Sequence, residues 1–146
     1  MELRTLGAGD RAAVTRLFRN VFTKEPWNDD WSDRTQLDAY IEDLTGQKNS
    51  LTLGCFERGR LAGLSMGHVK HWHTGTEYLI DEFCVEPSNQ GKGVGTAFMG
   101  LIGEHLKERG IHHIFLLTDR TVPAYGFYRK NGFKELKDSV SFVKTL

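Results

Sequence analysis

The sequence has little cysteine, little proline and no excess of either charge. Its two cysteines, Cys55 and Cys84, both fall inside apolar strand patterns, which is too few for a disulfide framework and is typical of a reduced, cytoplasmic protein. Lys plus Arg equals Asp plus Glu, at 19 each. There is therefore no bulk attraction to nucleic acid or to an anionic membrane, and we expect neither as a partner.

Long apolar runs are also missing. No stretch approaches the length that spans a membrane, and residues 1–5 lack the apolar core of a signal peptide. The 146 residues contain no repeats, linkers or low-complexity segments. We therefore expect residues 1–146 to form a single domain that buries a substantial core.

The spacing of apolar residues predicts both helices and strands. Helices are expected at 10–22 with Asp10 as its cap, at 33–44 with Gly46 as its end, at 93–109, and in a short stretch from Pro123. Strands are expected at 51–56 and 61–69 as a hairpin, at 78–85, at 111–118, and in the tail 134–144 as a terminal hairpin. Residues 114–117 are apolar on both faces, which is typical of a central, doubly covered strand.

A glycine-rich turn joins the strand at 78–85 to the helix that follows. Its residues Gly91, Gly93 and Gly95 let the backbone approach a ligand closely, because no Cβ is in the way. The helix beyond offers unpaired N–H groups and the positive end of its dipole, which together favour a phosphate or pyrophosphate. The strand, turn and helix thus indicate a site for a phosphorylated cofactor.

Two common phosphate-binding motifs do not fit this turn. A P-loop requires Ser or Thr after its lysine, but Gly93 follows Lys92. A dinucleotide fingerprint requires G-x-G-x-x-G, whereas the three glycines here alternate with other residues. The pattern that remains is Gln90-x-x-Gly93-x-Gly95.

This pattern resembles the acyl-CoA loop of the GNAT superfamily of N-acyltransferases, and a second motif carries the same resemblance. GNAT proteins typically have N-x-x-A-x-x-x-Y-x-x-x-G-F after the following strand. Here Ala124, Tyr128, Gly132 and Phe133 stand at the matching positions, with Thr121 where Asn is usual. The two motifs occur in the expected order. The resemblance implies an α/β (α+β) GNAT fold, with a mixed, mostly antiparallel sheet flanked by helices.

The resemblance also implies acetyl-CoA as cosubstrate and names the residues that would hold it. The strand before the loop splays from its neighbour in GNAT proteins, and pantetheine inserts at that point. By resemblance, the Val85 N–H would polarise the thioester carbonyl. The expected cofactor-binding residues are Phe83, Cys84, Val85, Gln90, Gly91, Lys92, Gly93, Val94, Gly95, Thr96, Thr121 and Tyr128.

Acyl transfer to an amine needs two proton-transfer groups. A lysine-like amine has a pKa of about 10.4 and must lose a proton before it attacks. Some GNAT members place a base at the position of Leu79, but a leucine cannot act as a base. We therefore expect Asp81 to be the base or to anchor the amine, and Glu82 is the second candidate. For either acid, a salt bridge is the alternative role. Strand alternation places Asp81 on the face of Leu79, Phe83 and Val85.

Tyr128 matches the family's tyrosine acid, which would protonate the leaving CoA thiolate. Plain core packing against Ala124 and Phe127 would also explain an aromatic residue at this position. Cys84 is expected to be a small buried residue rather than a nucleophile, since no His lies near it in a recognised arrangement. The resemblance therefore makes Tyr128 the expected general acid.

The acceptor is the least defined partner. The segment 25–31 combines two tryptophans with several acids and would suit a cationic or sugar-like amine, although it would serve equally as a helix-capping loop. Trp72 lies between His71 and His73 near a strand end, and these two histidines lack a third metal ligand, so no metal is expected. The expected substrate-binding residues are Trp27, Asp29, Asp30, Trp31, Trp72 and Asp81.

The sequence therefore predicts an N-acetyltransferase that moves acetyl from acetyl-CoA to a primary amine by direct attack in a ternary complex. A small-molecule acceptor is favoured, and aminoglycosides, polyamines, amino acids and peptides all remain open. Two other hypotheses are a protein or peptide acetyltransferase and a non-catalytic acyl-CoA sensor. A homodimer is consistent with the resemblance, because homodimers are common in the superfamily.

Overall fold

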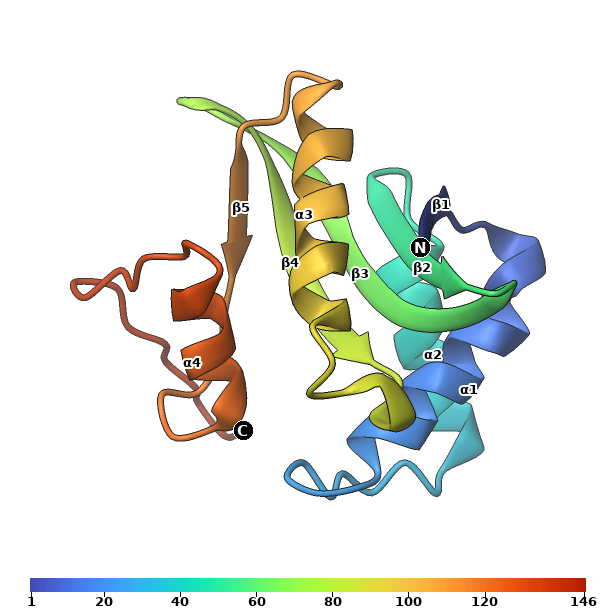
Figure 1. Cartoon of the computed structure of the whole chain (residues 1–146). Coiled ribbons are helices and arrows are strands. Elements are labelled where there is room, and N and C mark those ends of the chain that lie inside the picture. The colour runs from blue at the N-terminus through green and yellow to red at the C-terminus, as the bar shows by residue number, and fades with distance from the viewer.

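The computed structural model describes all residues from 1 to 146 and contains one sheet with helices on both sides (Figure 1). The strands are β1 (Glu2–Thr5), β2 (Ser50–Glu57), β3 (Arg60–Trp72), β4 (Gly75–Val85) and β5 (His113–Leu116). The α-helices are α1 (Arg11–Phe22), α2 (Arg34–Thr45), α3 (Val94–Lys107) and α4 (Pro123–Lys130), and two short 3₁₀ turns are η1 (Ala8–Asp10) and η2 (Pro87–Asn89). No helix is long and apolar enough to cross a membrane.

The five strands follow the order β1-β2-β3-β4-β5 across the sheet. The first three pairings are antiparallel and the last, between β4 and β5, is parallel. This confirms the mixed, mostly antiparallel sheet and the β2–β3 hairpin that the sequence predicts. Strand β1 was not predicted, because four residues of mostly polar sequence carry no clear alternation.

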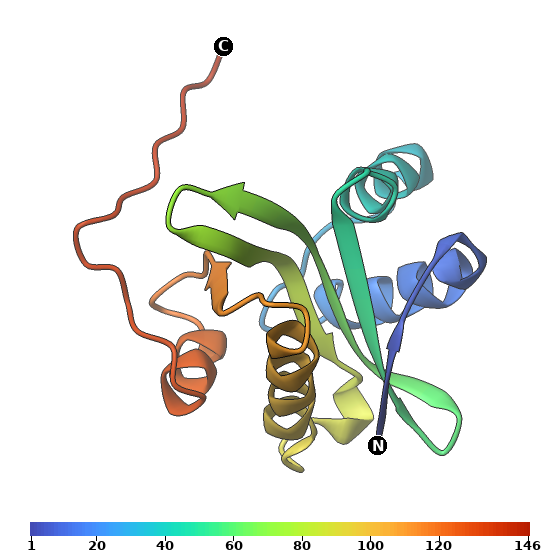
Figure 2. The same ribbon diagram turned by 90° about the horizontal axis from the view of Figure 1, so that it is seen from above.

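Helices cover both faces of the sheet (Figure 2), and each face buries its own hydrophobic core. Helices α1 and α2 cover one face, where Phe18, Leu37 and Ile41 pack against Leu64 and Met66. Helix α3 covers the other face, and its apolar residues pack against the opposite side of the same strands; the buried members include Tyr78, Ile80, Val85, Phe98 and Ile102. Residues on both sides of β4 are therefore held rigidly, and β4 carries the predicted catalytic acids.

A β-bulge in β4 corrects the predicted orientation of its side chains. Met66 pairs with Glu82 and Gly67 pairs with Ile80, so Asp81 is the extra residue that has no partner on β3. Simple alternation is broken there: Ile80 joins Phe83 in the core under α3, and Leu79 does not. Asp81 is therefore displaced from the regular pleat instead of lying on one face with Leu79, Phe83 and Val85.

Gly67 is the residue that makes room for this bulge, because a Cβ at Gly67 would lie 1.9 Å from the Leu79 carbonyl oxygen. We expect Gly67→Ala to lower the free energy of unfolding by about 3 kcal/mol or more, since the clash is with backbone rather than with a mobile side chain. Urea unfolding followed by circular dichroism would measure this loss.

Gly100→Ala is the matched control for that substitution. Gly100 is exposed in α3 and a Cβ there meets nothing within 4 Å, so the same added methyl should be neutral or stabilising by about 0.5–1 kcal/mol. Equal unfolding midpoints for the two variants would show that the bulge adapts to a side chain and does not require glycine.

The C-terminal third differs from the sequence prediction in two ways. Strand β5 is an edge strand that pairs only with β4, so it is not central, and Leu117 just beyond it is 74% exposed. The tail 134–146 contains no strand, and the predicted terminal hairpin is absent. The apolar pattern on both faces of β5 indicated a strand covered on both sides, but only Ile114 and Leu116 pack against the core, and all of residues 114–116 stay partly exposed.

The helix ends largely follow the sequence. Gly46 ends α2 and Pro123 begins α4, as predicted, and Gly110 follows α3 with a φ of 72°. The cap of α1 is different. Asp10 makes no side-chain cap to that helix, because its carboxylate instead accepts a hydrogen bond from the Gly7 N–H at 2.9 Å, closing the preceding 3₁₀ turn.

Candidate active site

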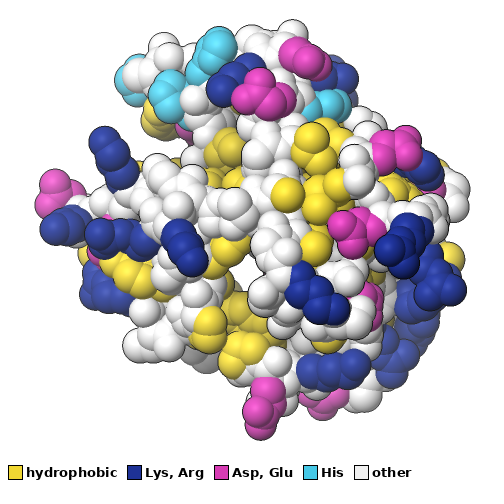
Figure 3. All heavy atoms as spheres, viewed as in Figure 1, with side chains coloured by type: hydrophobic (Ala, Val, Ile, Leu, Met, Phe, Trp, Pro, Cys, Tyr) yellow, Lys and Arg dark blue, Asp and Glu magenta, His cyan; other side chains and the backbone are white.

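A cavity of about 380 Å³ opens beside the bulge of β4. It lies between β4, the end of β5, the start of α4 and the loop that joins α1 to α2. In the face shown in Figure 3, the surface is hollowed between the C-terminal part and the rest of the molecule, and hydrophobic side chains border the hollow. The cavity-lining residues are Phe22, Trp27, Asp29, Ile80, Asp81, Glu82, Phe83, Leu116, Leu117, Thr118, Asp119, Ala124, Tyr128 and Ser141.

The charged groups of this cavity are all acidic. Asp29, Asp81, Glu82 and Asp119 contribute four carboxyl groups, and no Lys, Arg or His is among the lining residues. Because the chain as a whole has equal numbers of acidic and basic side chains, this local excess is not a reflection of composition. Carboxylates gathered in a concave site attract cations, so the cavity suits a positively charged ligand.

Next to the cavity, β4 and β5 separate. Their pairing ends at Ile80 and Leu116, which leaves residues 81–85 of β4 without a neighbour on that side. The Glu86 N–H donates to Ala62 on β3, whereas the Val85 carbonyl accepts from the Gln90 side chain at 3.0 Å. Since both polar groups of one strand residue point to the same edge, the Val85 N–H faces the gap. The expected splay is thus present.

The glycine turn lies at the mouth of this gap. Gly91 and Gly93 have φ values of 73° and 79°, in the left-handed region that favours glycine, and a Cβ on either would meet nothing within 4 Å. The first helical hydrogen bond of α3 runs from the Ala97 N–H to the Gly93 carbonyl. The amides of Val94, Gly95 and Thr96 precede it, and Gly93 supplies no side-chain cap, so these donors suit an anion.

The two predicted acids each have a neighbouring side chain that holds them. Asp81 Oδ2 lies 3.0 Å from His68 Nδ1, and both side chains are about one-third exposed. Glu82 Oε1 accepts a hydrogen bond from the Tyr40 hydroxyl at 2.6 Å. Burial raises the pKa of the Glu82 carboxyl, and the negative charges of Asp29 and Asp81 add to this, while the Tyr40 hydrogen bond opposes it.

Tyr128 stands on the opposite side of the cavity, in an aromatic cluster. Its ring meets Phe83, Phe127 and Phe133 edge-on, with ring centroids 5.3–6.4 Å apart. Burial raises the pKa of Tyr128 well above its ordinary value, and the charge of Glu82 raises it further. The phenol therefore stays protonated at neutral pH, as a general acid requires.

The structure separates the other predicted site residues into two groups. Trp27 and Asp29 line the cavity. Trp31 does not, because it stacks on Tyr40 at a centroid distance of 5.1 Å. Trp72 is exposed at the β3–β4 turn, next to Lys70, and does not line the cavity either. Asp30 accepts a hydrogen bond from the Ser32 N–H in the same loop.

Among the predicted cofactor-binding residues, Gln90 is hydrogen-bonded within the chain and Cys84 is buried. The Gln90 amide holds the Val85 carbonyl, and Lys92 and Thr121 are exposed. Burial raises the pKa of the Cys84 thiol strongly, so the thiol stays protonated and is a poor nucleophile. No group of three or more His, Cys, Asp or Glu side chains is arranged to hold a metal ion.

Sequence reasoning missed four residues that shape the site. Tyr40 lies within the helix predicted at 33–44, and nothing in that pattern points to a site role. The pairing of His68 with Asp81 follows from strand register, which the sequence does not show. Asp119 lies just after β5, and Ser141 comes from the tail. Of these four, only Asp119 could have been predicted from the sequence, because polar residues that follow a strand often line a site.

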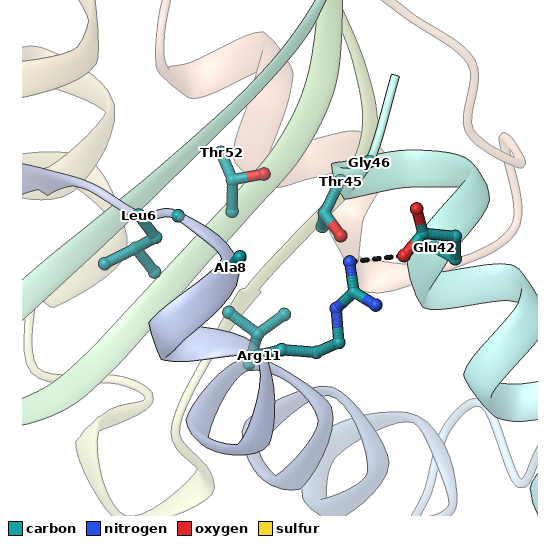
Figure 4. A pocket seen from close by; sticks show the side chains of 9 residues that line it. Leu6, Ala8, Arg11, Glu42, Thr45, Gly46 and Thr52 are labelled. Atoms are coloured by element: carbon teal, nitrogen blue, oxygen red, sulfur yellow. Dashed lines mark ion pairs between the residues drawn. The ribbon is translucent and has the colours of Figure 1, made fainter. Parts of the chain in front are cut away.

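A second cavity, of about 270 Å³, lies away from this chemistry, between η1, α1 and α2 (Figure 4). Arg11 and Glu42 form an ion pair across its opening. Both side chains are nearly half exposed, and the remaining lining is small or apolar. Its one carboxylate, Glu42, is held in this ion pair, whereas the cavity beside β4 is lined by four carboxyl groups and Tyr128. The site beside β4 is therefore the candidate active site.

Comparison with known proteins agrees with this geometry. Residues 12–133 match the model of the acetyltransferase (GNAT) family. A stretch of 76 residues is 33% identical to streptothricin acetyltransferase of Streptomyces lavendulae, covering 51% of this chain and 39% of that enzyme. The chain thus spans well under half the length of this relative.

Solved structures extend the likeness to the whole chain. An aminoglycoside acetyltransferase from an uncultured soil metagenomic sample, in complex with sisomicin, superposes with a TM-score of 0.76 at 20% identity over 99% of this chain and 95% of that one. Ribosomal-protein-alanine N-acetyltransferase from Brucella melitensis gives 0.75 at 19% identity, with both chains fully covered. At such identities the likeness establishes the fold. The family match covers most of the chain, and with the splayed β4 and the glycine turn it shows that this chain belongs to the acetyltransferase (GNAT) family.

Proposed function

We propose that this protein transfers an acetyl group from acetyl-CoA to the primary amine of a small cationic molecule, by direct attack in a ternary complex. The observation that carries the proposal is the acidic cavity, which opens onto the gap between β4 and β5. The acidic cavity therefore lies at one end of the open segment 81–85 of β4, and the N-terminus of α3, which suits an anion, follows the other end.

The residues around the gap fit acetyl-CoA. The amides from Gly91 to Thr96 would hold the pyrophosphate, because glycine conformations leave the space above them open. The free edge of β4 at Phe83 and Val85 would hold the pantetheine as a further strand, with main-chain hydrogen bonds. When bound, acetyl-CoA supplies the activated acyl group, and all other steps fall to side chains and amides of this chain.

Deprotonation of the amine falls to the acids on β4. We assign Asp81 as the base or amine anchor and Glu82 as the second acid, since both line the cavity. His68 is a positioning residue for Asp81: its Nδ1 contact fixes the carboxylate, which the bulge has displaced from the regular pleat. Tyr40 fixes Glu82 in the same way. The raised pKa of Glu82 makes it a stronger base than an ordinary carboxylate.

The remaining groups act on the acyl and leaving groups. The Val85 N–H, free on the open edge, would donate to the oxyanion that develops when the amine attacks. The Tyr128 hydroxyl, across the cavity, would donate its proton to the departing thiolate. Asp81 would thus accept a proton from the amine and Tyr128 would donate one to the thiolate, and both side chains line the same cavity.

The acceptor class follows from the shape and charge of the cavity. Four carboxylates and Trp27 in a concave site suit an acceptor with several amines, such as an aminoglycoside or another cationic antibiotic. The names of two similar proteins, a streptothricin and an aminoglycoside acetyltransferase, support this choice. A protein substrate is the alternative, since a ribosomal-protein acetyltransferase shares the fold.

Release of free CoA thiol from acetyl-CoA across a panel of amines tests the proposal. The panel holds aminoglycosides, streptothricin, polyamines, amino acids and lysine peptides. We expect turnover on polycationic small molecules, and we expect Tyr128→Phe to lower kcat about 100-fold with little change in the KM for acetyl-CoA. Lost packing cannot account for such a change, because Phe keeps the ring.

The same panel separates the alternatives. Turnover on peptides alone would identify a protein acetyltransferase. Tight acetyl-CoA binding with no turnover on any amine would identify a sensor and contradict the proposal. An unchanged rate and pH profile in Tyr128→Phe would mean that Tyr128 only packs.

A further inference from the structure

A half-buried carboxylate stands immediately before the glycine turn. Glu86 follows Val85 at the end of β4, and its side chain lies on the face of the sheet that α1 and α2 cover, whereas Val85 packs under α3. A negative charge is an unexpected neighbour for a turn that suits an anion, because like charges repel. The position of this carboxylate therefore calls for a physical reason.

The reason is a hydrogen bond between segments that are far apart in the chain. The Asn20 amide, on α1, donates from Nδ2 to Glu86 Oε1 at 2.7 Å, and the Lys24 ammonium donates to Asn20 Oδ1 at 2.5 Å. The amide is thus oriented between a cation and an anion, and hydrogen bonds to charged groups are the stronger class. Figure 1 shows the turn after β4 beside the C-terminal half of α1.

The backbone of Glu86 is held as well. Its N–H donates to the Ala62 carbonyl on β3 at 2.8 Å, and its carbonyl accepts from the Asn89 N–H at 2.8 Å, which closes η2. Residues 87–93 make hydrogen bonds only within the stretch 85–97. Glu86 is therefore the point at which the start of the turn is attached to the rest of the molecule, to β3 by its backbone and to α1 by its side chain.

Helix α1 also holds the loop on the acceptor side of the site. The Lys24 carbonyl accepts from the Trp27 N–H at 3.0 Å, and the Phe22 carbonyl accepts from the Asp29 N–H at 2.8 Å. Phe22, Trp27 and Asp29 all line the acidic cavity. The last turns of α1 are thus hydrogen-bonded both to the loop that lines the cavity and, through Asn20, to the residue that begins the glycine turn.

We infer that Asn20 is a positioning residue: through Glu86 it holds the glycine turn in the geometry that binds the acetyl-CoA pyrophosphate, at a fixed place relative to the acceptor loop 25–31. The inference rests on the proposed function, because it assigns both residues to that same site. Neither side chain lines the cavity, so neither touches the acceptor there. Without the bond, part of the binding energy of acetyl-CoA is spent on ordering the turn.

Calorimetric titration with acetyl-CoA tests the inference without an acceptor. Asn20→Leu keeps the size of the side chain and removes the donor, so we expect about 10-fold weaker binding. Glu86→Gln keeps an oxygen that accepts from Asn20 and should bind within about threefold of wild type. Asn49→Leu is the matched control, because Asn49 Nδ2 also donates to a distant segment, at the Val69 carbonyl, but not at the turn; its affinity should be unchanged.

A second background separates positioning through Glu86 from packing of α1. In a Glu86→Leu protein, Asn20→Leu should have no further effect on acetyl-CoA affinity, because the contact is already absent. In turnover of a substrate amine, Asn20→Leu alone should lower kcat about 10-fold, since the two substrates no longer meet in the right geometry. The KM of the acceptor should stay unchanged, because the cavity lining is untouched.

Two results would overturn the inference and leave the proposed function standing. One is an acetyl-CoA affinity of Asn20→Leu within about twofold of wild type, and the other is an equal loss with and without Glu86. Wild-type protein that binds no acetyl-CoA would instead overturn the proposed function, and the inference with it.

Discussion

Asp81→Asn is expected to lower kcat/KM for the amine acceptor by about 10²–10⁴-fold, while acetyl-CoA binds as in the wild type. Asp81 lines the acidic cavity at the β4 bulge, whereas the amides that would hold the pyrophosphate lie beyond the end of that strand. Asn keeps the shape and the contact with His68 but cannot take a proton. Steady-state rates and calorimetric acetyl-CoA binding measure the two effects separately.

Two control variants show whether the loss belongs to Asp81 itself. Glu82→Gln removes the other acid, which Tyr40 holds, and should cause a smaller loss that falls mainly on the KM of the acceptor. His68→Gln removes the partner of Asp81 and should lower kcat less than Asp81→Asn does, because a positioning residue acts only through the carboxylate.

The pattern of these variants distinguishes the assignments. If Asp81→Asn retains full activity and Glu82→Gln loses it, the base is Glu82, whose pKa is already raised by burial. If neither loses activity, water takes the proton. If His68→Gln has no effect on the rate, the contact with Asp81 is only structural.

The sequence predicted the local elements of the fold better than the contacts between segments that are far apart in the chain. The glycine turn and the helix after it are local, because each depends on residues within a short segment, and both are present. The splay of β4 from β5 involves two distant segments, and it was expected from the family resemblance. The position of Asp81 is not local. Its displacement depends on a bulge opposite Gly67, and the register of β3 against β4 is not written in either strand alone.

Contacts between distant segments account for the other differences. His68 and Tyr40 reach the acids from β3 and α2, and no spacing rule links those positions to β4. The tail has the alternation of a strand, and residues 114–117 have the apolar pattern of a covered strand, so both predictions describe a paired state. In the structure the tail forms no strand, and β5 is paired on one side only, with β4. Local pattern therefore identifies which residues form strands, but it does not identify the partner.

Gly93→Val is expected to weaken acetyl-CoA binding by at least about 100-fold, because it places a side chain in the open space in front of the first amides of α3. The φ of 79° also makes any non-glycine residue strained there, at a cost of about 1–3 kcal/mol. A binding loss alone would therefore not separate an occupied ligand site from a weakened fold.

Gly110→Val separates the two, because Gly110 matches Gly93 in backbone conformation, in exposure and in the space around it. It follows α3 at the other end of the helix, has a φ of 72°, and a Cβ there also meets nothing within 4 Å. Both variants should lose similar stability in urea, and calorimetry at a temperature where both are folded should show normal acetyl-CoA binding only for Gly110→Val. Equal acetyl-CoA affinity in the two variants would show that the pyrophosphate does not bind at the glycine turn. The acidic cavity is lined by other elements, including β4, β5 and α4, so that result would leave the proposed acceptor site to be tested separately from the pyrophosphate site.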